Sequence, residues 1–160
     1  MNLAIISIAQ QRLTVRDEWD NSLFSCRVNS AKNGVGCVQD SGCTPLGAHY
    51  VRASIGQGLS PFALLKGRRA TGAEWTPELM AEQPEGDWIL GRILWLCGLE
   101  KGVNRGGAVD TFRRYIYVHG SPPWHESMSP SSHGCIRVQP SDMLKVFDLL
   151  PYGSRVSIET

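Results

Sequence analysis

The segment from Arg113 to Pro140, RRYIYVHGSPPWHESMSPSSHGCIRVQP, contains the strongest structural and chemical signals in the sequence. It opens with the alternation of a β-strand, because Tyr115, Tyr117 and His119 fall on one face at a period of two with aliphatic residues between them. Residues 120–131 are rich in Pro, Ser and Gly and cannot continue either regular structure. The pattern therefore predicts a strand that ends at a histidine, followed by a loop.

The loop leads into the motif Ser132-His133-Gly134-Cys135-Ile136-Arg137. Here a cysteine follows a glycine and is flanked by a histidine and an arginine, an electropositive and conformationally permissive setting that can favour a thiolate. A nucleophile needs a base within hydrogen-bond reach, and His119 can arrive there if the loop folds back. We predict that Cys135 and His119 are the nucleophile and general base of a cysteine acyltransferase. The cysteines predicted to be structural are Cys26, Cys37, Cys43 and Cys97.

These residues resemble the active-site motif of the L,D-transpeptidase (YkuD-type) catalytic domain. Thr44-Pro45-Leu46-Gly47 resembles a second segment of that domain, and with the C-terminal helix and strand the resemblance spans nearly the whole chain. It implies a mostly β fold, sandwich- or barrel-like, with one clear helix in the C-terminal half and a single catalytic domain over residues 1–160. It also implies a peptidoglycan stem peptide as substrate, attacked at the bond between the L-centre of a diamino acid and a terminal D-amino acid.

The resemblance also suggests how the base is oriented. In the family a backbone carbonyl just after this histidine holds the ring, so Gly120 or Ser121 would hold His119 here. Asp110, the nearest upstream carboxylate, remains an alternative partner.

The nucleophile motif supplies further candidate site residues. The backbone N–H groups of Gly134 and Cys135 are the natural oxyanion donors, and His133 could tune the thiol electrostatically. Ser132 is a candidate substrate-binding residue. Arg137 either holds a carboxylate of the peptide substrate or braces the loop.

Arg92 interrupts the apolar run of residues 88–97. A charged residue in such a run is either paired or at a sheet surface. Arg92 therefore binds a substrate carboxylate, faces solvent or pairs with an acid of the protein.

A zinc site has the right residue types in His119, His125, His133 and Cys135. Their spacing matches no established zinc pattern, and a ligated Cys135 would be a poor nucleophile. We therefore predict an enzyme without a metal or another cofactor.

The rest of the chain reads as small β units around one helix. Residues 140–150 repeat apolar side chains on one helical face, between Pro140 and Pro151. Residues 29–49 are expected to form a long loop, and residues 66–87 either a lid or substrate-binding wall or a surface excursion, with one helical turn at Pro77–Glu82. Strands are predicted over residues 3–9, 12–16, 23–28, 50–55, 88–97 and 155–158.

Composition sets the broad class. The 160 residues suit one domain, 42% are hydrophobic and 19% charged, and no apolar run reaches the roughly 20 residues of a membrane span. A net charge of +1 gives no electrostatic case for binding nucleic acid or an anionic membrane.

The compartment is predicted from the N-terminus and the cysteines. Leu3 to Ile8 is apolar but lacks a basic flank and continues into a strand pattern, so we expect a hairpin rather than a signal peptide. Five cysteines without a CxxC pair fit reduced thiols and the cytoplasm, with a Cys37–Cys43 bridge as the exception. A periplasmic location is the alternative.

The acyl acceptor decides the reaction. Cys135 would expel D-alanine and form a thioester, which water hydrolyses in an L,D-carboxypeptidase and an amine captures in an L,D-transpeptidase. A cytoplasmic protein would meet soluble precursors or recycled fragments. We therefore predict a carboxypeptidase that trims tetrapeptides to tripeptides during peptidoglycan recycling. The alternatives are an exported transpeptidase and a non-catalytic muropeptide-binding module.

Overall fold

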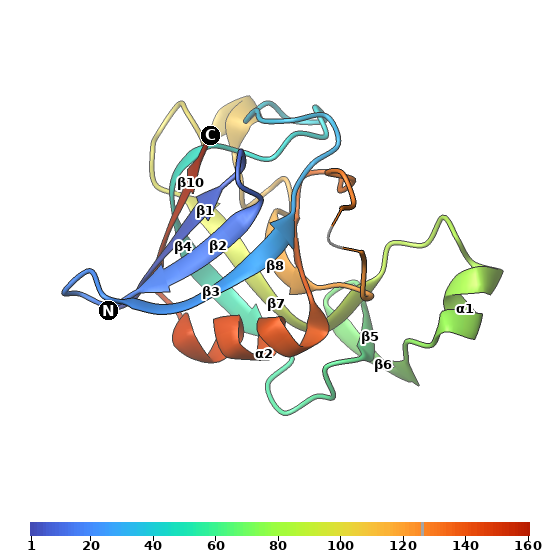
Figure 1. The fold of residues 1–160 in the computed structure, drawn as a ribbon. Helices are drawn as coiled ribbons and strands as arrows, with labels where there is room; N and C mark the ends of the chain where they lie inside the picture. Colours follow the sequence, from blue (N-terminus) through green and yellow to red (C-terminus); the bar gives the residue numbers. More distant parts are fainter. Residues whose placement is uncertain (126) are drawn as a thin grey trace.

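The computed structural model describes residues 1–125 and 127–160, and in this part of the chain ten strands form one sheet (Figure 1). The strands are β1 (Leu3–Ser7), β2 (Arg12–Arg16), β3 (Ser22–Asn29), β4 (Gly47–Ile55), β5 (Ala63–Lys66), β6 (Arg69–Glu74), β7 (Ile89–Gly98), β8 (Tyr117–Gly120), β9 (Ile136–Val138) and β10 (Arg155–Glu159). The helices are α1 (Pro77–Glu82), a short 3-10 helix (Gly107–Val109) and α2 (Pro140–Leu149).

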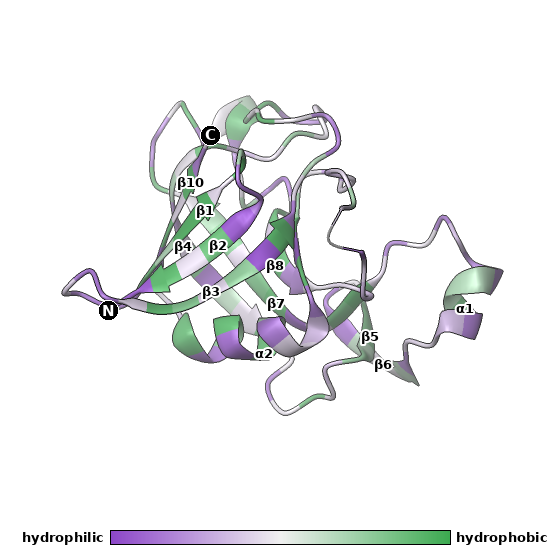
Figure 2. Ribbon diagram, in the orientation of Figure 1, coloured by the Kyte–Doolittle hydropathy of each residue, from purple (hydrophilic) through white to green (hydrophobic). Residues whose placement is uncertain are grey.

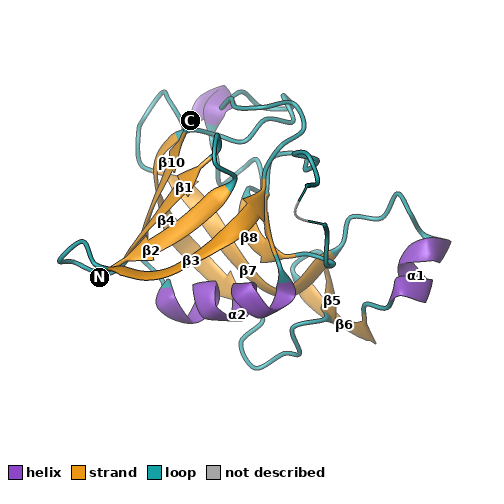
Figure 3. Cartoon of the chain, in the orientation of Figure 1, coloured by secondary structure: helices purple, strands orange, loops and turns teal. Residues whose placement is uncertain are grey.

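The sheet closes on itself as a barrel. Its order is β4-β10-β1-β2-β3-β9-β8-β7-β5-β6, and β4 also pairs with β7. The strands from β4 to β7 in that order therefore form a ring, and the β5–β6 hairpin extends the sheet beside the first residues of β7 (Figure 3). Two pairs are parallel, β1 with β10 and β8 with β9, while the other pairs are antiparallel.

The core lies inside the ring and under α2, where apolar residues alternate with polar ones along the strands (Figure 2). Side chains at a period of two point inward, as Ala4 and Ile6 do on β1. The helix covers one side of the barrel and buries Met143, Val146 and Phe147. Pro140 opens α2, a position where the absent N–H of proline costs nothing.

The strand and helix predictions over the barrel are confirmed, including the helix after residue 139. Three strands were missed. β6 has no apolar alternation, since all its residues are exposed, while β5 and β9 are only four and three residues long. The strand predicted to end at His119 begins later than expected, because Tyr115 has a left-handed φ of 56° and lies outside β8.

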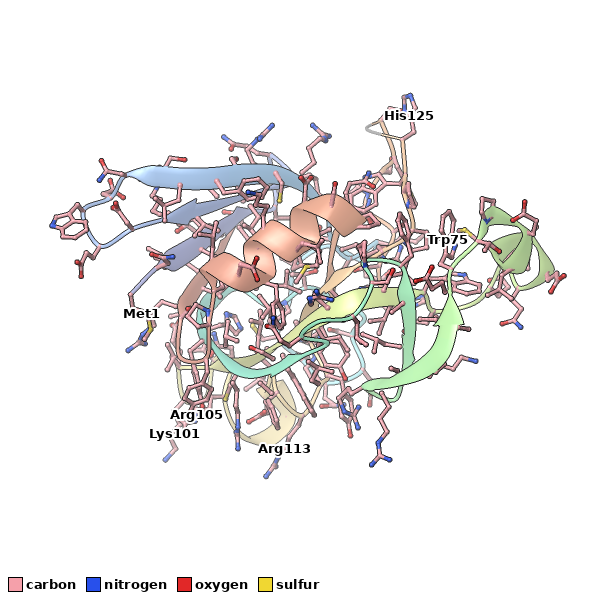
Figure 4. The ribbon with its side chains drawn as sticks, turned by 90° about the horizontal axis from the view of Figure 1, so that it is seen from below. Met1, Trp75, Lys101, Arg105, Arg113 and His125 are labelled. Atoms are coloured by element: carbon pink, nitrogen blue, oxygen red, sulfur yellow. The ribbon has the colours of Figure 1, made fainter. Side chains whose placement is uncertain are left out.

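Residues 67–87 form an arm that leaves the barrel through β6 and carries α1 at its far end (Figure 1). Thr76 caps α1, since its hydroxyl accepts a hydrogen bond from the Leu79 N–H at 3.1 Å. Trp75 lies at the base of this helix (Figure 4). Within the described residues, no helix is both long and apolar enough to cross a membrane.

Candidate active site

Strands β8 and β9 bring together the two parts of the segment Arg113 to Pro140 that contain His119 and Cys135. They run parallel, with His119 opposite Arg137 and Val118 opposite Ile136. Val118 and Ile136 point into the barrel core, so the alternate residues, His119 and Arg137, lie on its outer face together with Cys135. The loop does fold back, and the predicted nucleophile and base share one side of the sheet.

Cys135 stands immediately before β9, with its sulfur held by the backbone that leads into β8. The Tyr117 N–H donates to Sγ at 3.3 Å, and Sγ lies 3.4 Å from the Tyr115 carbonyl oxygen, which accepts from the thiol. The left-handed conformation of Tyr115 belongs to the turn just before β8, where this carbonyl meets the sulfur. The thiol proton is therefore hydrogen-bonded to a main-chain carbonyl.

Burial raises the pKa of Cys135 to about 11, and nearby Asp87 acts in the same direction. The Tyr117 N–H and the cations of Arg137 and Arg114 lower this pKa, but burial outweighs them. The raised pKa favours the protonated thiol at neutral pH over the thiolate that the electropositive motif can favour. Activation requires a base at the moment of attack.

His119 is buried, with 2% of its surface exposed, and its Nδ1 lies 2.7 Å from the carbonyl oxygen of Gly120. A carbonyl can only accept, so Nδ1 carries the proton and Nε2 keeps its lone pair. Burial also lowers the pKa of His119, which keeps the ring neutral. This tautomer is the one that can take a proton from a thiol.

The backbone geometry at Gly120 requires glycine, since a Cβ there would collide with the Leu90 carbonyl oxygen. The alternative orienting group, Asp110, is bound elsewhere: its carboxylate accepts from the N–H groups of Gly106 (2.7 Å) and Arg113 (2.9 Å). The Ser121 N–H donates to the Val138 carbonyl. Gly120 is thus the residue that holds the imidazole.

A small cavity of about 180 Å³ opens beside Cys135. It gathers most of the predicted site residues and adds four that were not predicted, Asp87, Arg114, Tyr115 and Ile116. Its lining consists of Asp87, Arg114, Tyr115, Ile116, His119, Ser132, His133, Cys135 and Arg137.

The loop before Cys135 is fixed by its own hydrogen bonds. The Ser132 hydroxyl donates to the Cys135 carbonyl at 2.6 Å and accepts from the Gly134 N–H at 3.2 Å. Gly134 has a φ of 132°, which side-chain-bearing residues rarely adopt. The predicted use of the Gly134 N–H as an oxyanion donor is therefore not supported, because this N–H is already bound to Ser132.

Arg137 lies between the small cavity and a larger one of about 480 Å³. Its guanidinium donates to the Ser131 hydroxyl at 2.9 Å, and it forms no ion pair with the described residues. The arm contributes one wall of the larger cavity. This agrees with the expectation that residues 66–87 form a lid or substrate-binding wall, rather than a surface excursion. The lining consists of Asn29, Met80, Pro84, Gly86, Trp88, Ser121, Pro122, Pro123, Trp124, His125, Met128, Ser131 and Arg137.

Arg92 is placed away from both cavities, and the prediction that it binds a substrate carboxylate does not fit the structure. It is 8% exposed, donates to the carbonyls of Leu59 (2.7 Å) and Gly91 (2.9 Å), and lies over the Phe147 ring of α2. It forms no ion pair among the described residues, although the charge of Asp148 raises its pKa against the effect of burial. Backbone carbonyls and an aromatic face contact it instead.

Two of the missed residues carry charge. Arg114 donates to the carbonyl of Cys43 at 2.7 Å and to that of Gly36 at 3.2 Å, so it ties the 36–43 loop to the edge of the cavity. The sequence offered one indication of this role, because Arg114 directly precedes Tyr115 in the predicted strand. Asp87 ends the arm, and only the tertiary fold brings it to Cys135.

The candidate zinc ligands do not assemble. His125 points outward from its loop, far to one side of the barrel (Figure 4). Within residues 1–125 and 127–160, no three His, Cys, Asp or Glu side chains are placed to hold a metal ion.

Comparison with solved structures agrees with this architecture. The chain resembles the L,D-transpeptidase (residues 123–326) from Xylanimonas cellulosilytica, with 18% identity, a TM-score of 0.55, and coverage of 98% of this chain and 59% of that one. It resembles an L,D-transpeptidase from Mycobacterium smegmatis, with 20% identity, a TM-score of 0.55, and coverage of 99% and 58%. The L,D-transpeptidase LdtMt1, solved in complex with imipenem, matches with 17% identity, a TM-score of 0.57, and coverage of 98% and 58%.

These likenesses show the fold, and this chain spans about three-fifths of the length of each of these structures. No curated protein matches the sequence. The family model of the YkuD L,D-transpeptidase catalytic domain matches residues 2–158. The chain therefore belongs to the L,D-transpeptidase catalytic domain family.

Proposed function

We propose that this chain is a cysteine-dependent L,D-carboxypeptidase that removes the terminal D-alanine from peptidoglycan tetrapeptides. The observation that carries the proposal is the arrangement of His119 and Cys135 at one cavity, with the imidazole held by Gly120 in the tautomer of a base. Membership of the L,D-transpeptidase family supplies the substrate class.

The reaction starts from a neutral pair. As the substrate carbonyl arrives, His119 Nε2 takes the thiol proton from its resting place at the Tyr115 carbonyl, and Sγ bonds to the carbonyl carbon. The carbonyl π electrons move to oxygen and return when the C–N bond breaks, while His119 gives its proton to the leaving D-alanine amine. Water then attacks the thioester carbon while His119 takes one of its protons. The C–S bond breaks and His119 returns that proton to Sγ, which releases the tripeptide acid and restores the thiol.

The size of the small cavity supports water as the acyl acceptor. At about 180 Å³ it is below the roughly 300–1,000 Å³ of common ligand pockets, and water is the acceptor that needs least of this space. The larger cavity beyond Arg137 supports the alternative, an exported transpeptidase in which one of two peptides occupies it. Arg137, without an acidic partner in the described residues, is the proposed anchor for a substrate carboxylate.

The free thiols support a reducing compartment. All five cysteines are unpaired, including Cys37 and Cys43, for which a bridge was the expected exception. We propose the cytoplasm, where recycled or precursor peptides would be the substrates.

The deciding experiment is mass spectrometry of a tetrapeptide muropeptide incubated with the protein, with and without excess D-methionine, alongside Cys135→Ala. Cys43→Ala is the matched control, since Cys43 is also a half-buried free thiol. Tripeptide that forms despite the added amine, and only when Cys135 is present, supports the carboxypeptidase. Exchange of D-alanine for D-methionine would favour the transpeptidase instead.

A non-catalytic muropeptide-binding module is distinguished by covalent labelling. Because a solved neighbour was captured in complex with imipenem, this carbapenem is the natural probe. A mass adduct that is lost in Cys135→Ala and kept in Cys43→Ala supports an enzyme. Peptide binding without any adduct or turnover would support the binding module.

A further inference from the structure

Thr44 is a polar residue with none of its surface exposed, and its hydroxyl joins two distant loops. Oγ1 accepts from the Ala31 N–H at 3.0 Å and lies 2.9 Å from the Gly134 carbonyl oxygen. The direction of both bonds is unambiguous, because an amide N–H only donates and a carbonyl only accepts. Thr44 therefore donates its single proton to Gly134.

The backbone around Thr44 is itself fixed. Its N–H donates to the Gly34 carbonyl and its carbonyl accepts from the Gly36 N–H, both at 2.9 Å. Pro45 follows, which restricts the preceding residue to extended conformations. The hydroxyl is thus presented from a rigid support.

The hydrogen bond from Thr44 to the Gly134 carbonyl also sets the direction of the Cys135 N–H, which belongs to the same peptide unit. The Gly134 C=O and the Cys135 N–H belong to one planar trans peptide and point in opposite directions. Thr44 does not line the small cavity, whereas Cys135 does. A carbonyl drawn toward Thr44 therefore turns the Cys135 N–H away from Thr44, to the side of the cavity.

The Cys135 N–H is also the donor that the motif leaves available. The Gly134 N–H is bound to the Ser132 hydroxyl, whereas no acceptor for the Cys135 N–H is found within the described residues. An unpaired main-chain donor next to a nucleophilic sulfur has the position that an oxyanion donor needs. Gly134 contributes no side chain that could fix the peptide plane, so the plane depends on its bonding partners.

We propose that Thr44 is a positioning residue that aims the Cys135 N–H at the oxyanion formed during acyl transfer. The inference rests on the proposed acyl-enzyme reaction. When Sγ bonds to a carbonyl carbon, the displaced π electrons reside on oxygen until the leaving group departs, and the aimed N–H stabilises that charge. Thr44 touches neither substrate nor sulfur.

The test compares two reactions of the same thiol in Thr44→Val and Thr44→Ser. In acylation by p-nitrophenyl acetate, the sulfur–carbon bond forms through an oxyanion and nitrophenolate leaves. In alkylation by iodoacetamide, the sulfur displaces iodide from a saturated carbon and no oxyanion forms. Both products are quantified on the Cys135 peptide by mass spectrometry, which separates them from reaction at Cys37 and Cys43.

Removing one oxyanion donor slows catalysis by about 100- to 1,000-fold, so misaiming it in Thr44→Val is expected to slow acylation by at least about tenfold. Alkylation should stay within about twofold, because it needs only an accessible sulfur and its proton transfer. Thr44→Ser keeps the hydroxyl and should restore acylation. All rates are measured below the onset of thermal unfolding of each variant, and Thr44→Ala replaces Thr44→Val if the latter does not fold.

Equal loss of acylation and alkylation in Thr44→Val would overturn the inference, since it would mean that Thr44 only keeps the sulfur in place. Unchanged acylation would overturn it as well. Failure of the native chain to acylate at Cys135, with alkylation intact, would instead refute the proposed function together with this inference. The three results differ in the two rates, so each is distinguishable.

Discussion

The resting state of Cys135 is the feature of the site that sequence reasoning described least well, and it can be titrated directly. Burial raises the pKa of the Cys135 thiol from its ordinary value of 9.0 to about 11. At pH 7 the thiolate fraction is then about 10⁻⁴, roughly a hundredfold below that of a thiol with the unshifted value. Neutral thiol and neutral imidazole are expected to form the resting pair.

The shift also predicts how stability depends on pH. The thiol of the unfolded chain ionises near 9 and that of the folded chain near 11, so the folded state holds the proton longer. Stability is therefore unaffected below pH 9 and falls as the pH rises from 9 to 11, by at most about 2.7 kcal/mol at 1.36 kcal/mol per unit. The half-buried position of Cys135 makes this an upper limit.

The assay is the ultraviolet absorbance of the thiolate between pH 5 and 10, taken as the difference between the native chain and Cys135→Ala. The difference should be absent at pH 7 and reach only about a tenth of its full amplitude at pH 10. Circular dichroism at each pH confirms that the chain stays folded. A full thiolate signal at pH 7 that disappears in His119→Ala would refute the reasoning, because it would show a resting thiolate–imidazolium pair.

Three further outcomes are expected. Arg137→Gln should raise the KM for a tetrapeptide at least about tenfold, as expected for loss of a charge-assisted hydrogen bond, and leave acylation by a small ester unchanged. His49 is fully buried between Gly47 and Thr111, and burial lowers its pKa to about 4. The free energy of unfolding, measured with urea, should therefore fall by about 3 kcal/mol as the pH falls from 6.5 to 4. His49→Phe should remove this pH dependence. Arg92→Met should leave small-ester acylation unchanged and lower the free energy of unfolding by about 1.5–3 kcal/mol, measured by urea unfolding; a selective loss of activity would return Arg92 to the site.

The sequence was sufficient to predict a helix or strand where apolar residues recur with the period of that element. Alternation over β1, β2 and β8 predicted strands, and the apolar face of residues 140–150 predicted α2, because each depends on which side of one element faces the core. The exposed strand β6 has no such constraint on its side chains, so its sequence carries no period.

The chemistry of the site depended on contacts that sequence distance hides. The neighbours of Cys135 in the motif are polar and suggested a thiolate, but the burial that sets its pKa comes from residues distant in the chain. The side-chain orientation of Arg92 likewise could not be predicted, because both faces of β7 are buried and its sequence does not alternate. The resemblance of the segment that begins at Thr44 was visible in sequence, but its bond to Gly134 was not.

The braces of the nucleophile loop have a consequence for the order of folding. Thr44 and Gly134 are 90 positions apart, and the bonds from Ser131 to Asn29 span 102. Closing such long segments costs chain entropy before any contact offsets it, so they form late and slowly. The N-terminal braces are synthesised well before Cys135, and the reactive geometry is completed only once β9 docks between β3 and β8. A chain in which β9 has not docked therefore carries an ordinary cysteine, and catalytic competence would report that docking.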